Sequence, residues 1–348
     1  MRLFFRKKIE IGEIIVFDLV TKMDRKEANK YGVYFLANDF VYDWTIAFLN
    51  SFRTFNPDLP LYLIPFNENC DRVLSLKDTY NFEIYIDDSF SQLEAIGEAF
   101  ELGYTKTGPY WFRRYAAFWG PLQQFMYLDT RQVILADLKP FIQALEQFDF
   151  EFLHYDCALD QVYEPGEFRR EMLRTGKGRG FNSGRWASHR GLFSLKEFEQ
   201  LAEKALQIRE QLNPRNTDQA FINYCCDVKP VRYGHFAEVI GGLCQDGWAR
   251  KQGTIYQQDG KYFLWDYGGN DHKKQLFLLH WAGYKTPFTS PKWRFYSWYV
   301  AKNKKLPTRI TLSFSSYFQS WLYKIISLFR KNRIINQFYH QLKFILKK

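Results

Sequence analysis

Apolar runs alternate with apolar positions at helical spacing over the first 135 residues of the chain. Short runs rich in β-branched and aromatic residues predict buried strands at 32–36, 61–65, 82–86, 125–128 and 133–135. Between these runs, apolar side chains recur three or four positions apart, which predicts helices at 41–54, 69–78, 91–102 and 109–122. Strands that alternate with helices indicate βαβ units, so we predict an α/β fold with a mostly parallel sheet flanked by helices.

The rest of the chain is less regular. Its apolar pattern predicts strands at 150–154 and 275–279 and helices at 195–212 and 217–225. Residues 159–180 are polar and rich in Gly, Arg and Glu, so we predict a loop there. The segment 287–307 begins and ends with Pro and predicts a hinge.

These patterns divide the chain into three parts. We expect a charged N-terminal lead-in at 1–31, the α/β domain at 32–290 and a C-terminal tail at 291–348.

Charge is distributed unevenly along the chain, whose formal net charge is +10. The last acidic residue is Asp271, and the residues after it include 16 Lys and Arg. The part up to Asp271 therefore has a net charge of −6. A mildly acidic domain with a cationic end favours a partner for the tail alone, and we expect no nucleic acid along the domain.

The cysteines and the N-terminal segment indicate in which cellular compartment the protein is located. Five cysteines without CxxC spacing indicate neither a disulfide framework nor a zinc site, and they favour a reducing compartment. The apolar run near the N-terminus is interrupted by Glu10, Glu13 and Asp18, so we expect no secretory signal. No window reaches the roughly 18 charge-poor apolar residues of a spanning helix. We therefore expect a cytoplasmic protein.

Polar residues follow two of the predicted strands directly. Ligands of parallel sheets bind beyond the carboxyl ends of the strands, which indicates residues 37–39 and Asp129. Asp129 suits a cation or a sugar hydroxyl, and it equally suits the cap of a turn. Asp137 precedes a Leu-Lys-Pro segment, so we predict that it caps a helix N-terminus.

Several segments occur in the order found in a known family. The sequence reads GVYFLANDFVYD at 32–43, FRRY at 112–115, YLDTRQVILADL at 127–138, FNSG at 181–184, ASHRGLF at 187–193, TDQAFIN at 217–223 and HWAGYK at 280–285. Over about 32–287 the chain thus resembles glycosyltransferase family 8, the group of glycogenin and the bacterial lipooligosaccharide galactosyltransferases. It resembles more closely a group of uncharacterised bacterial glycosyltransferase-like proteins.

The resemblance implies a fold and an activity. The fold is GT-A, a Rossmann-like, mostly parallel mixed sheet, followed here by a helical basic C-terminal extension. The activity is transfer of a sugar, with retained anomeric configuration, from a nucleotide diphosphate sugar such as a UDP-sugar. The acceptor is a hydroxyl of a glycan or of a lipid-linked glycan.

The resemblance also implies which residues hold the donor. The nucleoside would contact four residues at the end of the first strand, namely Ala37, Asn38, Asp39 and Tyr42. Arg113 would face the diphosphate, because a guanidinium binds phosphate oxygens in pairs. The residues alone leave open that Arg113 and Arg114 form a solvated helix face.

Metal ligands and sugar-binding residues follow from the same resemblance. Asp129 and His280 would ligate Mn²⁺ or Mg²⁺, and Lys285 would neutralise the leaving diphosphate. The sugar hydroxyls and the catalytic centre would be served by Asn182, Asp218 and Gln219. The residues alone leave open a structural role for His280 and a role for Asp218 at the start of a helix.

The sequence departs from the family pattern at two positions. The family has Asp-x-Asp, whereas here the third position is Arg131, which cannot ligate a divalent cation and repels one. Lys285 lies five residues after His280, where the family has six. Three outcomes follow: Arg131 binds the diphosphate and transfer needs no metal, metal binding persists weakly through Asp129 and His280, or a degenerate domain binds sugar nucleotides without turnover.

The tail has an apolar stripe among basic residues. Over 307–348, apolar residues recur at spacings of 3, 4 and 7, as in Phe314, Phe318, Trp321 and Ile325, with Lys and Arg between them. Such a helix favours the surface of an anionic membrane and so a peripheral location at the inner face of the cytoplasmic membrane. The alternative is a helix that packs on the domain and shows a basic outer face. A third function class is nucleic-acid binding through the tail, for which aromatic and basic residues also suit.

Overall fold

The computed structural model describes residues 30–100, 108–155, 159–175, 180–215, 217–241, 253–265, 275–284 and 286–331. Nearly all of the predicted lead-in, Lys285 and the end of the tail after Lys331 lie outside these residues. The chain forms two compact units, each from three segments. The first is Met1–Phe40, Asp58–Asp129 and Asp137–Cys244, and the second is Val41–Pro57, Thr130–Ala136 and Gln245–Lys348.

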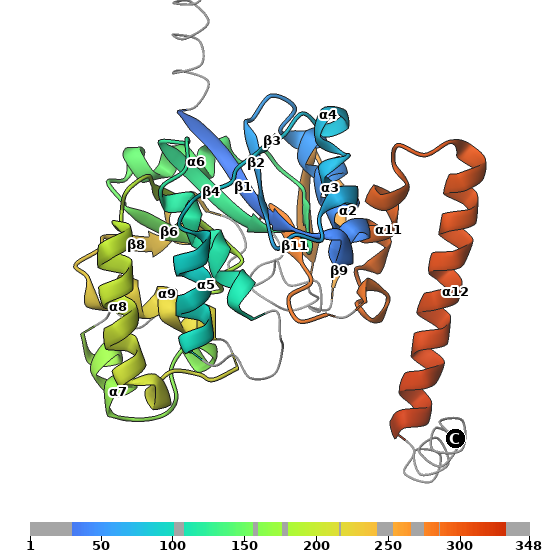
Figure 1. Ribbon diagram of the computed structural model, residues 1–348. Coiled ribbons are helices and arrows are strands. Elements are labelled where there is room, and N and C mark those ends of the chain that lie inside the picture. The colour runs from blue at the N-terminus through green and yellow to red at the C-terminus, as the bar shows by residue number, and fades with distance from the viewer. Residues whose placement is uncertain are drawn as a thin grey trace, which may run out of the picture. The chain divides into compact units, whose positions relative to one another are not determined.

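The first unit is built on a seven-stranded mixed sheet (Figure 1). In spatial order its strands are β3 (Glu83–Ile84), β2 (Leu61–Pro65), β1 (Tyr31–Ala37), β4 (Gln124–Asp129), β7 (Arg185–His189), β6 (Phe152–His154) and β8 (Tyr233–His235). The first four run parallel, β7 is antiparallel to both of its neighbours, and β6 and β8 are parallel to each other. The predicted mostly parallel sheet is therefore confirmed.

Helices of the first unit cover this sheet because its central strands are apolar on both faces. The longer ones are α5 (Phe90–Ala99), α6 (Lys139–Gln147), α7 (Glu167–Arg174), α8 (Leu195–Gln207) and α9 (Thr217–Val228), and η2 (Pro109–Phe118) is a ten-residue 3₁₀ helix. The shorter ones are η1 (Asp39–Val41), α3 (Asp71–Leu74), α4 (Lys77–Tyr80), η3 (Leu159–Gln161), η4 (Arg209–Gln211) and α10 (Phe236–Val239).

Alternate residues of the central strands serve two cores. Phe125 and Tyr127 of β4 join one hydrophobic cluster with α5, η2, α8 and α9, which lie together in Figure 1. Met126 and Leu128 are equally buried but lie outside that cluster, as expected for a strand whose side chains point to opposite faces. Helix α6 contacts β1, β4 and β7 with buried side chains that are also outside that cluster. A sheet with helices on both faces results, as in other parallel sheets.

The second unit is assembled around α2 (Tyr42–Phe55). This helix packs against β5 (Gln132–Ile134) and α11 (Trp293–Ala301), and β5 pairs antiparallel with β11 (Leu278–His280). The Asn50 side chain donates a hydrogen bond from Nδ2 to the carbonyl oxygen of Tyr299 at 2.7 Å, which ties α2 to α11. The remaining elements are the hairpin of β9 (Thr254–Gln258) and β10 (Lys261–Trp265), η5 (Pro287–Thr289) and the long helix α12 (Leu306–Lys331).

Some local predictions are wrong. The predicted loop at 159–180 contains helix α7, and the predicted hinge at 287–307 contains helix α11. The predicted helix at 69–78 is two single turns, α3 and α4. Asp137 does accept a hydrogen bond from the backbone of Lys139, the first residue of α6, although the N-cap position itself is Leu138. Three cysteines, Cys70, Cys225 and Cys226, are free thiols buried in the first unit.

Candidate functional site

The polar ends of two parallel strands lie next to each other. In the β1–β4 ladder Leu36 is opposite Asp129, so residues 37–39 and Asp129 leave the sheet at the same edge. This is the carboxyl edge, where the general rule for such sheets places a ligand. The sequence prediction that joins these two positions is consistent with the register.

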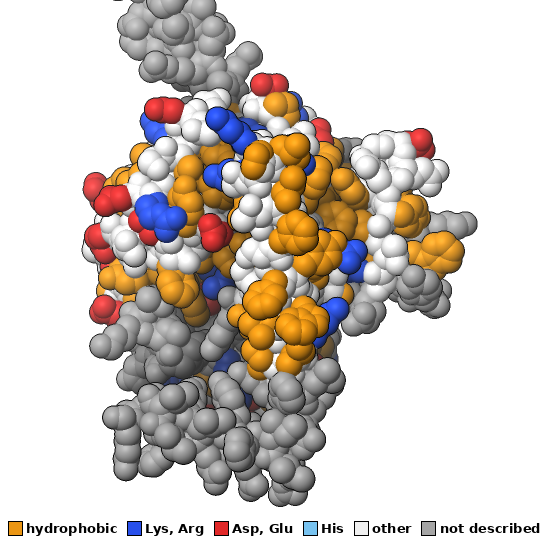
Figure 2. Space-filling model, turned by 90° about the vertical axis from the view of Figure 1, so that its right-hand side faces the viewer, with side chains coloured by type: hydrophobic (Ala, Val, Ile, Leu, Met, Phe, Trp, Pro, Cys, Tyr) orange, Lys and Arg blue, Asp and Glu red, His pale blue; other side chains and the backbone are white. Residues whose placement is uncertain are grey.

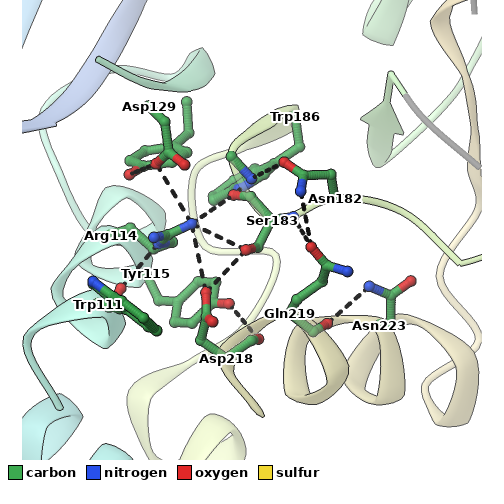
Figure 3. A network of polar contacts seen from close by, with 12 residues as sticks. Trp111, Arg114, Tyr115, Asp129, Asn182, Ser183, Trp186, Asp218, Gln219 and Asn223 are labelled. Atoms are coloured by element: carbon green, nitrogen blue, oxygen red, sulfur yellow. Dashed lines mark hydrogen bonds and ion pairs between the residues drawn. The ribbon is translucent and has the colours of Figure 1, made fainter. Parts of the chain in front are cut away.

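Asp129 is held by two side chains from its own unit. Its Oδ1 accepts a hydrogen bond from the Tyr127 hydroxyl at 2.7 Å and lies 3.5 Å from Nη1 of Arg114 (Figure 3). Its backbone amide donates to the carbonyl oxygen of Gly184 at 2.8 Å, which fixes where strand β4 ends. The side chain of Asp129 retains 30% exposure, so one part of this carboxylate faces solvent.

Arg114 is the centre of the polar network in Figure 3. Its Nη1 donates to the carbonyl oxygen and to the hydroxyl of Ser183, both at 3.0 Å, and its Nε donates to the carbonyl oxygen of Trp111 at 2.9 Å. The same Nη1 lies 3.5 Å from a carboxylate oxygen of Asp129 and 3.5 Å from one of Asp218. The buried guanidinium therefore links two carboxylates that are far apart in the sequence.

Burial and charge act in opposite directions on the ionisation of this network. Burial alone disfavours the charged form of Arg114, but the neighbouring Asp129, Tyr127 and Asp218 outweigh it and raise the pKa of the guanidinium. Burial also raises the pKa of Tyr127 well above its usual range, so its hydroxyl keeps its proton and donates to Asp129. Arg114 is thus a fixed cation between the carboxylates of Asp129 and Asp218.

Asp218 closes the other side of the network from the first turn of α9. Its Oδ2 accepts a hydrogen bond from the Ser183 hydroxyl at 2.9 Å, and its backbone carbonyl accepts one from the Tyr115 hydroxyl at 2.7 Å. The side chain is only 8% exposed. Asp218 therefore lies in the first turn, as the alternative interpretation has it, and in the same cluster as Asp129.

Asn182 and Gln219 form the adjoining polar pair. Nδ2 of Asn182 donates to Oε1 of Gln219 at 2.9 Å, and Oδ1 of Asn182 accepts from the backbone amide of Gly184 at 2.9 Å. Gln219 is buried, whereas Asn182 is partly exposed. Behind them, the Asn223 side chain bonds both backbone groups of Phe181, which anchors the start of the 181–184 turn on α9.

Gly184 is required by the geometry of this turn. A Cβ atom at this position would lie 2.4 Å from Oδ2 of Asp129 and 2.9 Å from Oδ1 of Asn182. Any side chain there would displace the carboxylate or the amide. The turn therefore brings Asn182 and Asp129 together because one residue lacks a side chain.

The end of β1 uses its polar side chains within the protein. The Asp39 carboxylate accepts hydrogen bonds from the backbone amides of Arg72 and Val73 at 3.1 and 3.0 Å, at the start of α3. Asn38 donates from Nδ2 to the side chain of Asn67 at 3.1 Å. The carbonyl oxygen of Ala37 accepts from the amide of Phe66 at 2.8 Å. These contacts fix the loop after β1 on the loop after β2.

Arg113 and Arg114 are both buried on η2, so the interpretation of a solvated helix face is wrong. Arg113 belongs to a different cluster from its neighbour. It donates to Glu94 at 2.5 Å, to Glu68 at 2.9 Å and to the carbonyl oxygen of Pro65 at 3.1 Å. Neighbouring residues of a 3₁₀ helix point about 120° apart, which separates the two arginines. Arg114, which the sequence did not single out, is the one that contacts Asp129 and Asp218.

Three candidate residues belong to the second unit. Tyr42 is the first residue of α2, and His280 is the last residue of β11 and is buried. Arg131 donates from Nη1 to the carbonyl oxygen of Tyr284 at 3.1 Å, and its own carbonyl accepts from the amide of Trp281 at 2.9 Å. Lys285 lies outside the described residues.

The donor set offers little to a divalent cation. Asp129 already accepts from a hydroxyl and lies beside a guanidinium, and Arg131 replaces the second carboxylate of the family motif. Within the described residues, no group of three or more His, Cys, Asp or Glu side chains is arranged to hold a metal. The described residues of the first unit therefore do not form a complete ligand set for a resident metal ion, and we derive no step through one.

Comparison with known proteins places the fold. No protein-family model matches the sequence, and no curated protein matches it. Among solved structures, the galactosyltransferase LgtC in complex with donor and acceptor sugar analogues aligns with a TM-score of 0.51 at 11% identity, over 79% of this chain and 97% of that one. An active-site mutant of LgtC gives a TM-score of 0.50 at 12% identity over the same shares. The apo form of mouse xyloside xylosyltransferase 1 aligns with a TM-score of 0.39 at 12% identity, over 59% of this chain and 84% of that one. The first two matches show that the fold is that of GT-A glycosyltransferases.

Proposed function

We propose that the protein is a glycosyltransferase that transfers a sugar from a nucleotide diphosphate sugar to an acceptor hydroxyl. The observation that carries the proposal is the network of Arg114, Asp129, Ser183 and Asp218 at the carboxyl edge of a GT-A sheet. A fold alone would not support an activity, because one fold hosts many functions. Here the fold comes with convergent polar groups at the place where such a sheet binds its ligand.

The partly exposed side chains of the network can contact a sugar, and the buried side chains hold the exposed ones in place. Asp129 and Asn182 are partly exposed and offer an acceptor and an amide to sugar hydroxyls. Arg114, Asp218 and Gln219 are buried directly behind them and fix their positions. This arrangement refines the expectation that Asp218 and Gln219 grip the sugar themselves, since in this proposal they act chiefly through their neighbours.

The donor is proposed to be a UDP-sugar. The uridine nucleotide is kept on the family resemblance alone; at the end of β1, Asn38 and Asp39 use their side chains in hydrogen bonds within the protein. Tyr42 and Arg113 are kept as nucleoside and diphosphate contacts on the resemblance alone. Arg113 uses three of its five N–H donors on Glu94, Pro65 and Glu68, which leaves two donors for a diphosphate.

Transfer breaks the bond between the anomeric carbon and the diphosphate oxygen and forms a bond from that carbon to the acceptor oxygen. The departing diphosphate keeps the electron pair of the broken bond, and the acceptor hydroxyl gives its proton to the diphosphate or to water. The charge that develops on the departing diphosphate needs a cation. We propose Arg131 for this role. Lys285 and retention of the anomeric configuration are added on the resemblance alone.

A second candidate function is binding of a sugar nucleotide without turnover. The observation that favours it is Arg131, because the position that carries a metal ligand in the family carries a cation here. The two functions share the same donor-binding residues. They differ only in whether the bond to the diphosphate breaks.

The deciding experiment measures binding and turnover of a panel of nucleotide sugars by the full chain, with Mn²⁺ and with chelator. Turnover that survives the chelator supports metal-independent transfer, and turnover only with Mn²⁺ assigns a metal to the reaction. Binding without turnover, with an acceptor panel present, favours the non-catalytic function. Absence of binding for every nucleotide sugar overturns both.

Asp218→Asn tests the network itself. The substitution keeps the shape and the hydrogen bond to Ser183 but removes the charge next to Arg114, so we expect turnover to fall by about 10²-fold. Asp227→Asn is the matched control, because Asp227 is a buried carboxylate of the same helix that accepts hydrogen bonds from Tyr163 and Tyr233 outside the network. Equal losses in the two variants would show that only folding is affected.

A further inference from the structure

Helix α12 presents two unlike faces. The face toward its own unit contains the buried Ser316 and Ser320 and contacts α11 and η5. The opposite face exposes Phe314, Phe318 and Trp321, which are 72%, 60% and 58% exposed. Further exposed apolar residues at helical spacing extend this face in both directions, namely Leu306, Ile310 and Leu322. We call these six residues the outer face of α12.

This arrangement reverses the ordinary pattern of a surface helix. A helix that serves only to cover its domain buries its apolar stripe and exposes its polar one. Here the serines are small enough to bring α12 close to α11, where the Tyr317 and Trp293 rings meet edge to face with centroids 5.0 Å apart. The expected packing on the domain is present, but the outer face is aromatic rather than simply basic. Figure 2 shows apolar side chains gathered along this face of the second unit.

The charged residues on α12 and just before it are all basic. Lys304, Lys305 and Lys324 are exposed on α12 or just before it, and Arg309 stacks on the Trp298 ring at 5.0 Å. The sequence contains no Asp or Glu after Asp271. Two copies that paired through this face would bring like charges together, which disfavours a homodimer. The outer face of α12 is instead complementary to a partner that has an apolar interior beneath a negatively charged surface.

We infer that the outer face of α12 docks on a bilayer that contains anionic lipid, with the helix axis in the plane of the membrane. Phe and Trp side chains prefer the boundary between head groups and acyl chains, and Lys and Arg beside them pair with anionic head groups. No described helix is long and apolar enough to span a bilayer. The inference deepens the proposed function, because a lipid-linked acceptor would then lie at the surface where the enzyme sits. It uses no residue of the candidate site.

The test measures binding of the full chain to vesicles by co-flotation, without any nucleotide sugar. Vesicles of phosphatidylcholine alone are compared with vesicles that also contain phosphatidylglycerol. We expect clear binding to the anionic vesicles and at least tenfold weaker binding to the neutral ones. Raising the salt concentration to about 1 M should weaken the binding, because it screens the lysines.

Two sets of variants separate the apolar and the basic contributions. The triple variant Phe314→Ser, Phe318→Ser and Trp321→Ser should lose binding on the order of 100-fold, since it removes most of the area that enters the bilayer. The triple variant Lys304→Gln, Lys305→Gln and Lys324→Gln should have a weaker preference for anionic vesicles, because it removes three of the 16 Lys and Arg that follow Asp271. All six positions are exposed, so the melting temperature should stay unchanged.

Trp265→Ala is the matched control, because Trp265 on β10 is 54% exposed, like Trp321, but lies outside α12. It should bind vesicles as the parent chain does. The inference is overturned if the parent chain does not bind anionic vesicles, or if the serine variant binds as well as the parent. It is also overturned if the parent is a dimer that the serine variant turns into monomers. Vesicle binding without any transferase activity would support this inference and contradict the proposed sugar transfer.

Discussion

Replacing Arg114 with Met removes the one cation that links Asp129 to Asp218. Each carboxylate lies 3.5 Å from Nη1, a distance at which two unit charges attract by about 5 kcal/mol at an effective dielectric constant of about 20, before desolvation is counted. Loss of one partner from a buried pair typically costs about 3–5 kcal/mol. Asp129 is partly solvated and recovers some of this cost, whereas Asp218 is almost fully buried. We therefore expect the free energy of unfolding to fall by about 3 kcal/mol, chiefly through Asp218.

Urea unfolding at pH 7 of a double-mutant cycle measures this value. In Arg114→Met with Asp218→Asn, the uncompensated charge on Asp218 is gone, so the double variant should be more stable than Arg114→Met alone. Arg114→Lys keeps the charge but loses the forked hydrogen bonds to Ser183. Its free energy of unfolding should therefore lie between those of the parent and of Arg114→Met. The reasoning is refuted if Arg114→Met costs less than about 1 kcal/mol, or if the Asp218→Asn substitution adds to its cost.

Two further predictions concern residues around the network. Gly184→Ala should lower kcat/KM by about 10²-fold, because its Cβ displaces the Asp129 carboxylate. Gly166→Ala is the control and should leave kcat/KM unchanged, because its Cβ meets nothing closer than 4.0 Å. An active, stable Gly184→Ala enzyme would contradict the geometry. The hydrogen bond from Arg113 holds the pKa of Glu68 below its usual range, so this pair stabilises the fold above about pH 4.5 and loses that effect as the pH falls. Because Glu68 is 78% exposed, Glu68→Gln should cost no more than about 0.5 kcal/mol in urea unfolding at pH 7, and a loss above about 1 kcal/mol would show that Glu68 does more than this surface pair allows.

The parts of the fold that the sequence predicts are those where burial alone decides the structure. The central strands β1 and β4 are apolar on both faces and stand out as continuous runs. Strand β7 was not predicted, because Arg185, Ser188 and His189 are polar although the strand lies inside the sheet. Helix α7 was predicted as a loop for the opposite reason. Only Met172 of this helix is buried, and its charged residues face solvent or pair with one another, as Arg174 does with Glu171.

The site was predictable in its acceptors and not in its cation. Asp129, Asn182, Asp218 and Gln219 follow from the family resemblance, and the structure brings all four together in the first unit. Arg114 could not be chosen over its neighbour from the sequence, because the two arginines are adjacent and equivalent in charge. The 3₁₀ geometry of η2 decides between them, whereas the apolar spacing predicted only a helix at 109–122.

The charge of the network limits which part of a donor it can hold. One guanidinium faces two carboxylates, so the group carries a net charge of −1, and the side that faces solvent is the Asp129 carboxylate. A diphosphate would be repelled there, whereas sugar hydroxyls can donate hydrogen bonds to the same oxygens. A nucleotide diphosphate sugar bound with its sugar on Asp129 and Asn182 therefore needs cations outside this network for its phosphates. Lys285, which the family resemblance implies for the diphosphate, and Arg131, which replaces a family carboxylate with a cation, are the first residues to substitute in testing for those cations.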